Sequence, residues 1–144
     1  MWVLTSSSGT EGKGNAILGP MARRLGPDEW QREAGQNADM ERAIAISRQT
    51  VGSDGLYSSV VTTQPGGTSR VHHHGACETS IYVMSGTARF TWGPTGVDQA
   101  FDAETGDIVY IPAGELHVEE NASSTEPLIV LVTRNCPEAV TIYP

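Results

Sequence analysis

The 144-residue chain has little positive charge. Its 9 Lys and Arg residues, of which only Lys13 is a lysine, stand against 17 Asp and Glu residues, so its formal net charge is −8. Because affinity for nucleic acid depends on neutralising phosphates, this balance disfavours a DNA- or RNA-binding function. An anionic substrate would need a local basic pocket in order to bind despite the negative electrostatic field of the whole chain.

Cysteine and long apolar runs are also scarce. The two cysteines, Cys77 and Cys136, are too few to form a disulfide framework in a chain of this length. The apolar start at residues 1–4 has no basic residues before it and is too short for a signal peptide or a membrane span. We therefore expect a soluble, cytoplasmic protein with no membrane partner.

Glycine and proline, in contrast, are frequent. The chain has 16 Gly and 8 Pro, about one turn-forming residue in six, which favours many short strands over a helical bundle. Apolar or alternating stretches that could form strands lie between these turns at 44–46, 56–63, 72–74, 81–84, 87–92, 97–101, 108–111, 128–132 and 139–143. About nine or ten short strands are typical of an all-β sandwich or barrel. The length predicts one domain.

The first 40 residues differ from the rest. Residues 5–15 are rich in Ser and Gly and indicate a flexible arm, or one that becomes ordered on a partner. The sequence Pro27-Asp28-Glu29 predicts the start of one short helix, which Gly35 would end. We expect residues 1–40 to form an arm and an extension that packs on a barrel formed by residues 41–144.

The four histidines point to chemistry. His72, His73 and His74 are consecutive, and His117 lies 43 positions after His74. Side chains alternate along a strand, so His72 and His74 would share a face that His73 does not. With the carboxylate of Glu78 they form a nitrogen and oxygen set suited to a divalent transition metal, which would keep two octahedral positions open. The alternative is a pair of surface imidazoles and a His117 satisfied in the core.

Two motifs contain these residues. The first reads Gly66-x5-His72-x-His74-x3-Glu78-x7-Gly86, and the second reads Gly106-x5-Pro112-x-Gly114-x2-His117-x3-Asn121. They resemble the two motifs of the cupin superfamily, and the segment from His72 to Gly86 resembles that of its small bacterial single-domain members. The second motif matches at every fixed position, whereas the first has seven residues between Glu78 and Gly86 where six are usual.

The resemblance implies a fold and a ligand set. The fold is a double-stranded β-helix of jelly-roll type with a metal inside the mouth of the barrel. The metal could be Fe, Mn, Ni, Co or Zn. The ligands carried over by the motifs are His72, His74, Glu78 and His117. Because of the extra residue after Glu78, a site with three histidines alone is the alternative.

Three further residues are candidates for catalysis. In a strand, Tyr82 shares the face of Glu78, together with Ser80 and Met84, and could hydrogen-bond a substrate. Glu119 shares the face of His117 and could be a general base or support the metal. Arg89 could hold an anionic group of the substrate. The alternatives are a packed Tyr82, a solvated Glu119 and a surface Arg89, and Cys77 is expected to be a small packing residue.

These observations favour a metal-dependent enzyme acting on a small molecule. It would be a dioxygenase, or it would use Lewis-acid chemistry as an isomerase, dehydratase, cyclase or decarboxylase. The alternative is a non-catalytic sensor that binds a small ligand. We also expect a homodimer, because a small jelly roll leaves a sheet face and strand edges that association can cover. Residues 2–4 could add to the sheet of a neighbouring copy.

Overall fold

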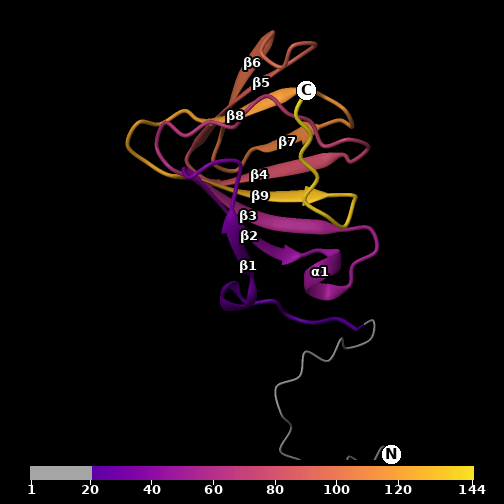
Figure 1. The fold of residues 1–144 in the computed structure, drawn as a ribbon. Helices are drawn as coiled ribbons and strands as arrows, with labels where there is room; N and C mark the ends of the chain where they lie inside the picture. Colours follow the sequence, from indigo (N-terminus) through magenta and orange to yellow (C-terminus); the bar gives the residue numbers. More distant parts are fainter. Residues whose placement is uncertain (1–20) are drawn as a thin grey trace, which may run out of the picture.

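Short strands separated by turns form two antiparallel sheets in the computed structural model, which describes residues 21–144 (Figure 1). The larger sheet has the order β1-β2-β3-β9-β4-β7 and the smaller has the order β6-β5-β8. The strands are β1 (Gln31–Ala34), β2 (Met40–Ile46), β3 (Tyr57–Thr63), β4 (Thr79–Ser85), β5 (Thr87–Trp92), β6 (Gln99–Glu104), β7 (Ile108–Ile111), β8 (His117–Asn121) and β9 (Leu128–Arg134). The expected all-β jelly-roll class is confirmed.

The chain changes sheet between β4 and β5 at Gly86. This glycine has a positive φ of 93°, a conformation that side chains disfavour. A Cβ atom added to it would lie 2.8 Å from the carbonyl oxygen of Pro127. Glycine is therefore needed here for both its conformation and its lack of a side chain.

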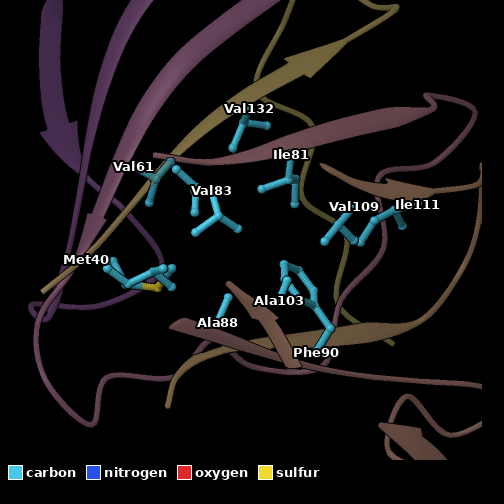
Figure 2. Packing of buried hydrophobic residues seen from close by; sticks show 12 residues of the cluster. Met40, Val61, Ile81, Val83, Ala88, Phe90, Ala103, Val109, Ile111 and Val132 are labelled. Atoms are coloured by element: carbon cyan, nitrogen blue, oxygen red, sulfur yellow. The ribbon is translucent and has the colours of Figure 1, made fainter. Parts of the chain in front are cut away.

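Apolar side chains from both sheets fill the space between them (Figure 2). In β9 the alternate residues Leu128, Val130 and Val132 are buried, and Ile81 and Val83 of β4 lie beside them. The facing residues of the smaller sheet include Ala88 and Phe90 of β5. In the strands that line the core, such as β3, β4 and β9, burial of one face produces the period-two pattern of the sequence. It also fixes which side chains point into the barrel.

The N-terminal part differs from the predicted helix. A single 3-10 turn spans Pro27–Glu29, and the chain then becomes extended and forms β1 instead of continuing as a helix to Gly35. Pairing with β2 places Glu33 opposite Arg42, whose guanidinium lies 3.0 Å from the Glu33 carboxylate. A one-turn helix that was not predicted, α1 (Arg48–Val51), follows β2. The predicted arm at residues 5–15 lies outside the described residues.

Cys77 and Cys136 form a disulfide, with their Cα atoms 5.8 Å apart. This corrects the expectation of two thiols. Cys77 lies two residues before Thr79 and Cys136 two residues after Arg134, and Thr79 pairs with Arg134 in the sheet. The antiparallel pairing of β4 with β9 therefore brings together two cysteines that are 59 positions apart in the sequence. Among residues 21–144, no helix is long and apolar enough to cross a membrane.

Candidate metal centre

Three imidazoles and one carboxylate converge inside the barrel. His72, His74, His117 and Glu119 each offer one ligand atom, and these atoms all lie within 4.8 Å of one another. The three histidines are buried, and the Glu119 side chain is 15% exposed. His117 and Glu119 are two positions apart in β8, so strand alternation gives them the same face.

The segment before the first two histidines runs alongside β8 without forming a regular strand. Ser69 N–H donates to the carbonyl of Glu119 at 2.8 Å. His72 and His117 exchange backbone hydrogen bonds of 3.1 and 3.0 Å, which places the two imidazoles on the same side. His73 pairs instead with Ile142 and lies outside the cluster, as alternation predicts.

Each imidazole is oriented by a backbone carbonyl. The Nδ1 atoms of His72, His74 and His117 lie 2.7, 2.7 and 2.8 Å from the carbonyl oxygens of Arg70, Val140 and Glu115, respectively. A carbonyl oxygen only accepts hydrogen bonds, so each Nδ1 carries the proton and each Nε2 keeps its lone pair. The Nε2 atom of His72 lies 3.3 Å from the side-chain amide nitrogen of Gln36. The Nε2 atoms of His74 and His117 are buried, and no residue among 21–144 hydrogen-bonds to them. Imidazoles held in this way are typical metal ligands.

The charges of the cluster also fit a metal. Burial lowers the pKa of His72, and it lowers the pKa of His74 to about 3. Burial acts to raise the pKa of Glu119, but the adjacent His117, followed by His72 and His74, outweighs it and lowers that pKa below its ordinary value. Neutral imidazoles and an ionised carboxylate are the states that bind a divalent transition metal.

The structure corrects the position of the carboxylate. Glu78 lies outside the cluster, where it accepts hydrogen bonds from the Tyr110 hydroxyl at 2.6 Å and from Asn135 Nδ2 at 2.9 Å. Its neighbour Thr79 is buried on the inner face of β4 and has the usual six residues before Gly86. The extra residue therefore places Glu78 on the opposite face, since a shift of one residue reverses the side of a strand.

The same shift explains the position of Tyr82. The prediction that Tyr82 points inward depended on an inward Glu78, and Glu78 lies on the outer side. Tyr82 accordingly points outward and is 41% exposed, and its alternate neighbours Ser80 and Met84 are exposed as well. Arg89 also points outward, where its guanidinium contacts the carboxylate of Asp102 at 2.8 and 3.1 Å. Of the three catalytic candidates, only Glu119 lies at the cluster.

Two cavities adjoin the cluster. One has a volume of about 20 Å³ and a mixed lining, with the polar residues His72, His74, Glu119, Gln36, Ser59 and Arg134 beside the apolar Met40, Val61 and Val132. The other has a volume of about 270 Å³ and is mostly apolar; its lining includes His117, Phe90, Trp92, Phe101 and Tyr110. Arg134 was not predicted as a site residue, although it continues the alternation of Leu128, Val130 and Val132 and so belongs on the inner face.

Named proteins resemble parts of this chain. A probable oxalate decarboxylase of Arthroderma benhamiae is 39% identical over 74 residues, which cover 51% of this chain and 18% of the relative. The oxalate decarboxylase OxdC of Bacillus subtilis is 34% identical over 89 residues, which cover 61% and 23%, respectively. This chain thus spans about a fifth of the length of these relatives. A solved structure describes Mn(II) centres in the Bacillus enzyme.

A solved structure similar over most of its own length supports the fold. The polyketide cyclase RemF of Streptomyces resistomycificus aligns with a TM-score of 0.68 at 20% identity, covering 85% of this chain and 84% of the cyclase. The sequence model of the Cupin domain family matches residues 59–134, more than half of the chain and all of the segment that supplies the cluster. With the two motifs, the jelly-roll sheets and this match, the chain belongs to the Cupin domain family.

Proposed function

We propose that this chain is a metal-dependent enzyme acting on a small molecule, with His72, His74, His117 and Glu119 as the metal ligands. The observation that carries the proposal is the orientation of the three imidazoles. Their Nδ1 atoms are held by backbone carbonyls, so their Nε2 lone pairs face the carboxylate of Glu119. Three imidazole nitrogens and one carboxylate oxygen suit a divalent transition metal such as Fe, Mn, Ni, Co or Zn.

The chemistry belongs to one of two groups. A metal held by these residues supplies either a Lewis acid that polarises a substrate carbonyl or a centre that binds dioxygen. The relatives named oxalate decarboxylase and the fold neighbour named polyketide cyclase support an enzyme rather than a sensor. The Mn(II) centres of the Bacillus relative support manganese among the candidate metals. A dioxygenase and a Lewis-acid isomerase, dehydratase, cyclase or decarboxylase are all compatible with this ligand set.

The larger cavity supports a small-molecule substrate. Its volume of about 270 Å³ is close to the lower end of the range for small-molecule sites, and its aromatic lining extends to His117. A molecule in this cavity would lie next to one metal ligand and against Phe90 and Phe101, whose rings stack with centroids 5.6 Å apart.

The assembly and the location of the chain remain predictions. A cytoplasmic location was predicted from the sequence. The Cys77–Cys136 disulfide argues for a more oxidising compartment, because reducing conditions in most cytoplasms keep thiols free.

The proposal is tested first by metal analysis of protein purified without oxygen. We expect about one divalent transition metal per chain, which His74→Ala and His117→Ala should abolish. His73→Ala is the matched control, because His73 lies outside the cluster and should leave metal content unchanged. Full metal content in both cluster variants would exclude the assigned ligands.

Turnover is tested with the metal-loaded protein. A mixture of small metabolites is incubated with it in the presence and absence of oxygen and is analysed by mass spectrometry. Consumption that requires oxygen identifies dioxygenase chemistry, and consumption without oxygen identifies Lewis-acid chemistry. Saturable binding of one metabolite with no transformation of any would replace the enzyme with the sensor.

A further inference from the structure

We infer that the metal centre binds a small carboxylate and that Arg134 anchors its negative charge. The inference rests on the proposed function, because it places the carboxylate beside the same metal. It names the chemical class of the ligand, which the metal ligands alone do not determine.

The first observation is a row of buried polar side chains at one end of the inner face of the larger sheet. Tyr57 of β3, Arg134 of β9 and Thr79 of β4 are paired across three adjacent strands, and all three are buried. In β9 and β4 the next inner residues, Val132 and Ile81, are apolar, whereas β3 buries the further polar residue Ser59 on this face. Polar groups therefore interrupt the apolar inner faces of β9 and β4 at the end where Arg134 lies.

The second observation is that these polar atoms lack partners. Within residues 21–144, no hydrogen bond reaches Arg134 Nε or Nη1, Tyr57 Oη, Ser59 Oγ or Thr79 Oγ1, although all of these atoms are buried. Most buried polar groups in proteins are hydrogen-bonded, and an unmatched group is costly. Arg134 and Ser59 both line the cavity beside the cluster, so their unmatched atoms indicate that a polar ligand or ordered water completes them there.

The third observation is the charge of Arg134. Its side chain is only 7% exposed, and none of the ion pairs among the described residues involves it. Arg42 lines the same cavity, but its charge is matched by Glu33. A divalent metal and Arg134 together exceed the single negative charge of Glu119, so the loaded site would be positive. A buried excess of positive charge favours an anionic ligand.

The geometry limits the ligand further. Arg134 and Ser59 line the same cavity as His72, His74 and Glu119, so one small group can reach both the guanidinium and the metal. The free volume of about 20 Å³ restricts this group to a few heavy atoms. The ring of Tyr57 lies 5.2 Å from the Arg134 guanidinium carbon and helps to position it. Guanidinium groups are well suited to carboxylates.

The test uses formate, the smallest carboxylate, as the probe. Protein loaded with Mn²⁺ is titrated calorimetrically with sodium formate at low ionic strength, with formamide as the neutral control and sulfate as a larger inorganic anion. We expect formate to bind the wild type, Arg134→Gln to weaken binding by about 10-fold or more, and Ser59→Ala to weaken it less. Arg89→Gln removes a surface arginine and should leave the affinity unchanged. Formamide and sulfate should bind weakly or not at all.

Two further measurements keep the outcomes distinct. Metal content and circular dichroism are recorded for every variant, and Arg134→Lys, which keeps the charge, should retain part of the affinity if Arg134→Gln does not fold. Equal formate affinity in the wild type and in folded Arg134 variants would overturn the inference, as would no formate binding by the metal-loaded wild type. Tighter binding of sulfate than of formate would overturn the carboxylate class.

Failure of the proposed function gives a different result. If the wild type takes up no metal, the metal-dependent enzyme is excluded whatever formate does. The role of Arg134 as an anchor is then tested with the metal-free protein. Formate should raise the midpoint temperature of thermal unfolding of the wild type but not that of Arg134→Gln. No such difference would overturn the anchor as well.

Discussion

Glu119 shows how a single residue determines the character of the candidate metal site. It lies two positions after His117 in β8 and within 3.4 Å of the His117 Nε2 atom. Glu78 has the same carboxylate but is held by Tyr110 and Asn135 on the other side of the sheet. The chemistry of a carboxylate is thus set by the face of the strand on which it lies.

This difference leads to a prediction about metal binding. Glu119→Gln removes the charge from the cluster and should lower the affinity for a divalent metal by roughly 100-fold, whereas Glu78→Gln should leave the affinity unchanged. Competition with a chromogenic chelator measures both values. The opposite order of effects would return the ligand role to Glu78.

A second prediction at this scale concerns the stability of the metal-free protein. The folded-state pKa of His74 is lowered to about 3, and that of His72 is also lowered, so the unfolded chain binds more protons than the folded chain below about pH 6.5. Stability should therefore fall as pH decreases from 7 to 5, with His74 contributing about 2 kcal/mol of this loss.

Urea unfolding at the two pH values measures this effect. The range lies above the ordinary pKa of Glu119, so that carboxylate adds little to it. His74→Asn is the comparison and should reduce the pH dependence, because asparagine does not titrate. A metal-free protein that is as stable at pH 5 as at pH 7 would contradict the prediction.

At the scale of elements, the segment after β9 supports the metal site although it forms no strand of its own. It leaves the sheet at the disulfide of Cys136 and runs toward β8 (Figure 1). The carbonyl of Val140 orients His74, and Ile142 exchanges two backbone hydrogen bonds of 2.9 Å with His73. The segment 139–143, predicted as a final strand, thus forms only an isolated bridge between Ile142 and His73, and its Val140 carbonyl orients His74.

Deletion of residues 139–144 tests this role. It leaves the disulfide in place but removes the acceptor that holds His74 Nδ1, so metal affinity should fall by about 10- to 100-fold. The same chelator competition measures the loss. Deletion of Pro144 alone is the control and should have no effect. Unchanged affinity after the longer deletion would show that His74 needs no carbonyl from this segment.

At the scale of the whole molecule, an apolar surface remains on the outer face of the larger sheet. Ile108 is 70% exposed and is paired with Tyr82, and Tyr110 lies two positions along β7. Met84 adds a fourth exposed apolar side chain on β4. This outer face, formed by β4 and β7 at the edge of the sheet, is self-complementary in chemistry and suits the predicted homodimer.

The prediction is that Ile108→Glu converts the dimer to a monomer. A charge placed in the centre of this face would be buried without a partner on association. Light scattering at micromolar concentration should give twice the chain mass of 15.3 kDa for the wild type and the chain mass for the variant. Val97→Glu, at an exposed position between β5 and β6, is the control. A monomeric wild type would exclude the dimer.

The part of the site that the sequence could predict is the part that local spacing controls. His72 and His74 share a side because they are two residues apart, and the same rule places Glu119 with His117. Frequent glycine and proline residues between alternating apolar stretches likewise determined the all-β class. These inferences needed only the two-residue alternation of side chains along a strand, which is visible within each short stretch of the sequence.

Only the tertiary structure decided which parts of the chain meet. The pairing of β4 with β9 joins Cys77 to Cys136 and places Arg134 between Thr79 and Tyr57, over long separations in the sequence. The extra residue before Gly86 left the face of Glu78 undecided until the register of β4 was known. Strand register depends on how whole faces pack in the core, so a single sequence stretch contains the alternation of faces but not which face points inward.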